Sequence, residues 1–217
     1  VPILYVVHLN GREGECRDES TYHNNLASGY RDGSIYDFVR SFTEDGDEVC
    51  MRSTDGTTSI DDLLDDASDF DVVVASGGDG TVTSVAYALA NTGVPLLPYP
   101  AGTANLLSLN LAQPNEPHAL AKLARRCETL DFDVAEIEAE GEKHGFMIMA
   151  GAGYDATIME SAAPNKKFFG TVAYFLAAGS NIVPQRSKIA ATIDGERHET
   201  EGLGVLVINF SKIQFDI

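Results

Sequence analysis

Val72-Val73-Val74-Ala75-Ser76-Gly77-Gly78-Asp79-Gly80-Thr81 is the stretch that decides the fold. A β-branched apolar run ends in a cluster of glycines, and an amphipathic helical pattern follows at once from Val82. The pattern predicts a strand, a tight turn and a helix. Glycines let a ligand approach the backbone closely, and the first turn of a helix offers N–H groups without intrahelical partners. The junction therefore favours a phosphate-binding site.

A charge-free window follows this turn in a chain that is otherwise strongly acidic. Between Gly80 and Asn115 the sequence has no Asp, Glu, Lys, Arg or His, although its formal net charge is −18. A second turn of small residues and prolines, Pro98 to Asn105, lies inside the window. Two such loops around Asp79 would suit the phosphates of a nucleotide and a Mg²⁺ ion held partly by this carboxylate. The plainer alternative is an ordinary strand–helix turn in which Asp79 caps the helix.

Two common phosphate-binding motifs do not match. A P-loop closes its glycine run with Lys followed by Ser or Thr, whereas Gly80 is followed by Thr81 and Val82. A Rossmann dinucleotide site needs a spaced glycine trio and an acid about 20 residues further on, and the window contains no acid.

Three motifs together resemble the diacylglycerol kinase catalytic-domain family, which includes bacterial lipid kinases and sphingosine kinases. They are SGGDGT at 76–81, PAGTAN at 100–105 and GAGYDA at 151–156. NAD kinases share the core of the first motif, whereas the other two at these distances favour the lipid kinases. The resemblance extends from about Val49 to Phe210 and includes the segment Lys166 to Tyr174.

The resemblance implies an enzyme that transfers the γ-phosphate of ATP to a lipid hydroxyl, with diacylglycerol as the expected acceptor and Mg²⁺ as cofactor. Asp79 would be the catalytic residue and the metal ligand. The expected nucleotide contacts are Thr54, Gly77, Gly78, Asp79, Gly80, Thr81, Gly102, Thr103 and Asn105. For the two threonines and Asn105, ordinary loop and capping roles are the alternative. An NAD-kinase-like phosphotransferase and a non-catalytic nucleotide-binding regulatory module stay open as other functions.

The sequence departs from the family pattern in three places. The Asn-Pro-x-Ser-Gly turn after the first strand is replaced by His8 to Arg12, and the Asn-Glu pair after the glycine turn is replaced by Thr83 and Ser84. The family carries a catalytic acid in a late DGE segment. Here Asp194-Gly195-Glu196 is better explained as a hairpin turn. We therefore expect the catalytic base to lie beyond residue 217.

Strands that alternate with amphipathic helices predict a three-layer, parallel-sheet α/β nucleotide-binding domain over residues 1–127. Helical spacing marks residues 35–42, 60–67, 82–89 and 120–127. Apolar runs mark strands at 3–7, at 94–97 and from Val72 up to the glycine turn, and a weaker strand is expected at 48–52. From Glu128 onward, alternation and hairpin signals predict an antiparallel β-rich, sandwich-like lipid-substrate domain over residues 128–217, which we expect to be incomplete.

The composition bears on partners and compartment. Asp and Glu number 33 against 15 Lys and Arg, a balance that disfavours nucleic acid and anionic bilayers. We expect a lipid substrate at the membrane surface and no nucleic acid, and a homodimer stays open. Cys16, Cys50 and Cys127 lack metal-ligand spacing and are expected to be reduced thiols. With no secretory signal pattern, the expected location is cytoplasmic with transient membrane association. Lys166 and Lys167 could meet phosphate or a lipid headgroup, or form a solvated pair.

Overall fold

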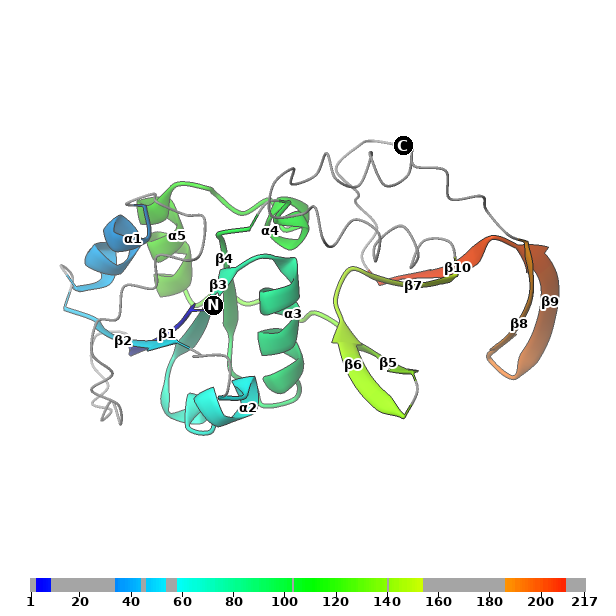
Figure 1. Cartoon of the computed structure of the whole chain (residues 1–217). Helices are drawn as coiled ribbons and strands as arrows, with labels where there is room; N and C mark the ends of the chain where they lie inside the picture. The colour runs from blue at the N-terminus through cyan, green and yellow to red at the C-terminus, as the bar shows by residue number, and fades with distance from the viewer. Residues whose placement is uncertain are drawn as a thin grey trace. The chain divides into compact units, whose positions relative to one another are not determined.

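The computed structural model describes residues 3–8, 34–43, 46–53, 58–102, 104–139, 141–153 and 186–209 (Figure 1). The chain divides into two compact units, with the division between Met147 and Ile148. The predicted domain boundary between residues 127 and 128 stays a prediction. The hairpin formed by β5, Ala135–Ala139, and β6, Glu142–Phe146, groups with the first unit.

A four-stranded sheet forms the centre of the first unit, in the order β2-β1-β3-β4. The strands are β1 Ile3–His8, β2 Glu48–Ser53, β3 Val72–Gly77 and β4 Leu96–Pro100. β3 and β4 are parallel, whereas β1 runs antiparallel to both β2 and β3. The expected α/β class is confirmed, and the sheet is mixed. Its parallel pair is the one that carries both glycine loops, so both loops leave the same edge of the sheet.

Helices cover both faces of this sheet (Figure 1). α1, Ser34–Thr43, and α5, Pro117–Arg125, pack together on one face, and α3, Asp79–Ala88, lies on the other with α2, Ile60–Leu63. Side chains of α1 and α5 join Val72 and Val74 in one buried cluster. Val73 and Ala75 point to the opposite face and are also fully buried. A strand buried on both faces needs a continuous apolar run, which explains the residues before Gly77.

The second glycine loop begins later than the sequence pattern predicts. β4 continues through Pro98 and Pro100, which pair with Ala75 and Gly77 of β3. Proline has no N–H to donate to a neighbouring strand, and it is tolerated here because β4 is one of the two edge strands of this sheet. The turn therefore starts after Pro100.

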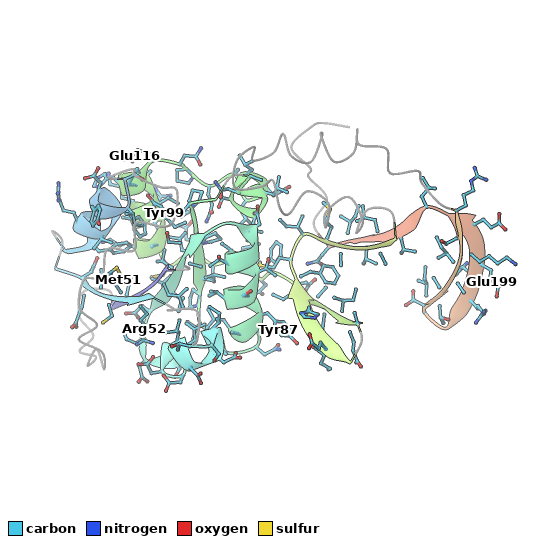
Figure 2. All side chains as sticks on the ribbon, in the orientation of Figure 1. Met51, Arg52, Tyr87, Tyr99, Glu116 and Glu199 are labelled. Atoms are coloured by element: carbon cyan, nitrogen blue, oxygen red, sulfur yellow. The ribbon has the colours of Figure 1, made fainter. Side chains whose placement is uncertain are left out.

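The helix predicted over residues 60–67 ends at Leu63, and a 3₁₀ turn, η1 Ala67–Asp69, follows. Arg52 of β2 explains the early end, because its guanidinium donates to the Leu63 carbonyl, which a continuing helix would use for its own ladder. The same guanidinium binds Asp66 through Nη2 and Oδ2 at 2.8 Å and through Nη1 and Oδ1 at 2.5 Å, and it lies over the Phe70 ring (Figure 2). Arg52 thus ties the edge strand β2 to the segment that leads into β3.

The second unit consists of two antiparallel strand pairs in the described residues. β7, Met149–Gly153, pairs with β10, Gly204–Ile208, and β8, Ser187–Ile193, pairs with β9, Glu196–Gly202. The turn between β8 and β9 has positive φ at both Asp194 (51°) and Gly195 (86°), the backbone that tight hairpins require. The hairpin interpretation of the DGE segment is confirmed.

One cysteine differs from expectation. Cys50 is disulfide-bonded, so the prediction that all three thiols are reduced is wrong for this residue, whereas Cys127 is free and exposed. The sequence gives no spacing rule that could have revealed this bond. Among the described residues, no helix is long and apolar enough to cross a membrane.

The buried Arg52–Asp66 pair leads to a first prediction. Both residues are less than a tenth exposed, so Asp66→Ala strands a guanidinium without its carboxylate and should lower the free energy of unfolding by about 3–5 kcal/mol. Asp65→Ala removes an exposed acid next door and should change it by less than about 0.5 kcal/mol. Urea denaturation of the two variants tests this, and equal midpoints would contradict the structural role of the pair.

Glu116 leads to a second prediction. Its carboxylate accepts from the N–H groups of His118 at 3.0 Å and Ala119 at 2.7 Å, and these bonds lower the pKa of Glu116. A lowered folded-state pKa stabilises the fold above the unfolded value of 4.5, and this contribution is lost as the pH falls through the folded pKa. Melting temperature measured against pH should therefore fall less steeply below pH 4.5 for Glu116→Gln than for wild type. Glu128→Gln serves as an exposed control. If the melting temperatures of wild type and Glu116→Gln fell equally steeply below pH 4.5, Glu116 would not cap α5.

Candidate functional site

The turn between β3 and α3 presents backbone donors. β3 ends at Gly77. Gly78 is the N-cap residue of α3 and has an extended backbone. Because glycine has no side chain, no side-chain oxygen accepts from the first N–H groups of the helix. The Val82 N–H is the first to close the helical ladder, on the Gly78 carbonyl at 3.1 Å. The N–H groups from Gly78 to Thr81 therefore have no intrahelical acceptor. They stand at the positive end of the α3 dipole, where anionic ligands are stabilised.

The second loop lies directly against the first. The Ala101 N–H donates to the Gly77 carbonyl at 3.2 Å, so the strand pairing continues one residue into the loop. A Cβ added to Gly102 would lie 2.4 Å from Gly78 Cα and 3.2 Å from Gly78 N. No side chain fits at position 102 without moving the backbone of the first loop. The two loops predicted to converge are thus in backbone contact.

Asp79 is half-buried and faces the second loop. Its Oδ1 accepts from the Leu107 N–H at 3.1 Å, at the start of α4, Leu106–Asn110. It does not cap its own helix, because Gly78 holds that position. The alternative in which Asp79 caps the helix that follows it is therefore wrong, and its carboxylate instead binds a first-turn N–H of α4 in the other loop. The carboxylate ties the two loops together and carries a second oxygen.

The remaining residues of the first loop divide into a packed pair and an open position. A Cβ on Gly77 would lie 2.6 Å from Thr81 Cβ, so the Thr81 side chain folds over Gly77. A Cβ on Gly80 would meet nothing within 4 Å, and the Gly80 carbonyl accepts from Ser84 Oγ at 3.0 Å. Gly80 is thus exposed, with no side chain packed over it.

The structure brings together seven of the nine predicted site residues, in one pair of loops. These are Gly77, Gly78, Asp79, Gly80, Thr81, Gly102 and Asn105. Thr54 and Thr103 lie outside the described residues, as do Lys166, Lys167 and Asp155. The described residues contain no group of three or more His, Cys, Asp or Glu side chains that could hold a metal. A cation here would therefore rely on Asp79 together with oxygens of its ligand.

Sequence reasoning missed a polar group at the far end of α3. The Tyr87 hydroxyl donates to Glu136 Oε2 at 2.5 Å, and Lys143 Nζ lies 2.8 Å from Glu136 Oε1. Tyr87 thus joins helix α3 to the β5–β6 hairpin (Figure 2). The bond to Glu136 raises the pKa of Tyr87, and the bonds from Lys143 and Tyr87 lower the pKa of Glu136. A Cβ on Gly145 would lie 2.4 Å from the Tyr87 ring, so the ring packs on bare backbone. The sequence signal was weak, because the partners are 49 residues apart.

Comparison with known proteins gives a family match over the part of the chain that contains both glycine loops. The model of the diacylglycerol kinase catalytic domain matches residues 24–137, more than half of the chain. A probable YegS-like lipid kinase of Klebsiella pneumoniae is 29% identical over 155 residues, which cover 68% of this chain and 50% of that protein. A diacylglycerol kinase of Mycobacterium tuberculosis is 30% identical over 109 residues, covering 49% of this chain and 35% of that one. The chain spans half the length or less of these relatives.

Solved structures give the same answer for the fold. A putative diacylglycerol kinase from Bacillus anthracis superimposes with a TM-score of 0.56 at 26% identity, over 75% of this chain and 53% of that one. A further diacylglycerol kinase structure from that organism gives a TM-score of 0.51 at 24% identity, over 74% of this chain and 52% of that one.

The contact between the two loops leads to a third prediction, because the three glycines differ in the space around them. Gly102→Ala forces the Gly78 backbone to move and should lower stability by about 1–3 kcal/mol. Gly78→Ala places its Cβ 3.5 Å from Gly102 Cα, an ordinary contact, and Gly80→Ala meets open space, so both should stay within about 1 kcal/mol of wild type. Thermal unfolding of the three variants tests this order. A Gly102→Ala variant as stable as Gly80→Ala would mean that the loops do not touch.

Proposed function

The chain belongs to the diacylglycerol kinase catalytic-domain family, and from that premise we propose that it forms the nucleotide-binding part of an ATP-dependent lipid kinase. The single observation that carries the proposal is the backbone contact between the loops at Gly78 and Gly102, beside the donor-rich first turn of α3. Such a cradle suits a polyphosphate chain, because it offers N–H groups and excludes side chains that would keep the phosphates away.

The proposed reaction is a phosphoryl transfer. A lipid hydroxyl oxygen forms a bond to the γ-phosphorus of ATP, the bond from that phosphorus to the β–γ bridging oxygen breaks, ADP leaves, and the hydroxyl proton passes to a base. Positioning and charge stabilisation carry most of such a reaction, so few reactive side chains are required. In this proposal the amides of residues 78–81 hold the phosphates, and Thr54 and Thr103 are further nucleotide contacts.

Asp79 is the proposed metal ligand. Mg²⁺, when bound, would neutralise charge that develops on the phosphate oxygens. The residues present fit such an ion, because Mg²⁺ is often held by one or two carboxylates plus substrate phosphates, and Asp79 lies beside the proposed phosphate cradle. Oδ1 is held by the Leu107 N–H, so the remaining oxygen of the carboxylate can face the ion.

The acceptor is proposed to be a lipid of the diacylglycerol type, because the relatives include proteins named as diacylglycerol kinases and probable lipid kinases. Such an acceptor requires transient contact of a cytoplasmic enzyme with a membrane. With a formal net charge of −18, the chain is repelled by anionic bilayers. The proposal therefore favours neutral or weakly charged lipid surfaces and predicts faster turnover as salt screens the repulsion.

An NAD-kinase-like transfer and a non-catalytic nucleotide-binding module are the competing functions. Phosphotransfer from labelled ATP, measured with the full-length protein on a panel of lipids and on NAD, separates the three. Label in a lipid supports the proposal, label in NAD supports the first alternative, and ATP binding without any transfer supports the second.

Asp79→Asn gives the sharpest version of this test and a fourth prediction. The amide oxygen can still accept from the Leu107 N–H, so the fold should remain, but the charge that a cation needs is lost. Lipid phosphorylation should fall by about 100-fold or more, since a metal ion contributes several kcal/mol to such a transition state. Ser84→Ala, which loses only a bond to the Gly80 carbonyl, is a control within the same helix. Near-normal turnover of Asp79→Asn would eliminate Asp79 as the metal ligand.

A further inference from the structure

Asn105 uses both ends of its side-chain amide on one residue of its own loop. Its Oδ1 accepts from the Gly102 N–H at 2.8 Å, and its Nδ2 donates to the Gly102 carbonyl at 3.0 Å. Each bond pairs a donor with an acceptor, so the reversed orientation of the amide would lose both. The side chain therefore clamps the backbone of Gly102 at two points.

The clamped residue is the one with the least room in the site. Gly102 lies against Gly78 so closely that an added Cβ would come within 2.4 Å of Gly78 Cα and 2.8 Å of Asn105 Oδ1. A small shift of Gly102 would therefore move the backbone of the first loop, because interiors packed this tightly transmit displacement. The Asn105 side chain determines where that backbone contact is made.

The backbone of Asn105 explains why this residue type occurs here. Its φ of 49° and ψ of 44° lie in the left-handed region, which asparagine tolerates better than most residues. Its carbonyl accepts from the Leu109 N–H at 3.1 Å and so begins α4. Glycine would adopt the same backbone without strain but would lack the clamp.

We propose that Asn105 is a positioning residue that sets the phosphate cradle through Gly102, and not a side-chain ligand of the nucleotide. The proposal rests on the proposed function, since the cradle has meaning only if the chain binds a polyphosphate. It replaces the expectation from the sequence that Asn105 is a direct nucleotide contact. The bonds to Gly102 direct its side chain at the loop's own backbone.

A double-mutant cycle tests the proposal in the 217-residue chain. Mg²⁺·ATP affinity is measured by calorimetry for wild type, Asn105→Gly, Gly102→Ala and the double variant, with melting temperature as a check on folding. Asn105→Gly keeps the left-handed backbone and removes the two bonds, so we expect about tenfold weaker binding. If Asn105 acts through Gly102, the double variant should bind no more weakly than Gly102→Ala. Asn91→Gly is the matched control, because Asn91 also has positive φ (63°) and is exposed.

A second readout does not depend on nucleotide. Hydrogen exchange at the Gly102 amide should speed up in Asn105→Gly, and it should stay slow in Asn105→Asp, which keeps the acceptor. The amide of Val74, fully buried in β3, is the reference, because both amides would exchange faster together if Asn105→Gly only folded poorly. Additive losses of affinity in the cycle, or an unchanged Gly102 amide, would overturn the proposal. If the wild-type chain fails to bind Mg²⁺·ATP, the proposed function fails and the inference fails with it. Binding by wild type with additive losses refutes the inference alone.

Discussion

The close approach of two backbones at Gly78 and Gly102 is the constraint on which the site depends. Neighbouring strands lie about 4.8 Å apart, and parallel strands end at the same edge, so the chains leaving β3 and β4 must pass each other immediately. No side chain fits between them at Gly102. The cradle is therefore a product of sheet geometry, with glycine as the residue that allows it. The side chains of Asp79 and Asn105 then hold in place two loops that the sheet has already made adjacent.

The electrostatic setting follows from the same geometry. A chain of net charge −18 is a poor partner for a polyanion unless the charges near the ligand differ from the average. In physiological salt, exposed charges more than about 8–10 Å away are largely screened. The stretch from Gly80 to Asn115, which begins in the first loop and contains the whole second loop, has no Asp, Glu, Lys, Arg or His, and the first turn of α3 adds a positive dipole end. A single carboxylate, Asp79, is then compatible with phosphate if a cation lies between them.

Much of the α/β unit could be predicted because its signals are local. The apolar run of β3 and the helical spacing of α1, α3 and α5 depend only on neighbours in sequence, and the positive-φ turn at Asp194-Gly195 depends on its own residues. The misses depend on partners far along the chain. Pro98 and Pro100 fit into β4 because the order of the strands places β4 at an edge of the sheet. α2 ends early because the Arg52 guanidinium donates to the Leu63 carbonyl. The hydrogen-bond partner of Asp79 is a backbone N–H, and no residue type in the sequence predicts such a partner.

The bond from the Leu107 N–H to Asp79 would support the proposed metal binding rather than compete with it. An isolated carboxylate rotates freely and must be ordered when a cation binds, which costs conformational entropy. The Leu107 N–H holds Oδ1 and so limits that rotation before any ion arrives. Groups that orient metal ligands in this way are part of the function of many metal sites. The same bond also fixes α4, and thereby Asn105 and Gly102, relative to the first loop. One carboxylate can thus assemble the cradle with one oxygen and serve its ligand with the other.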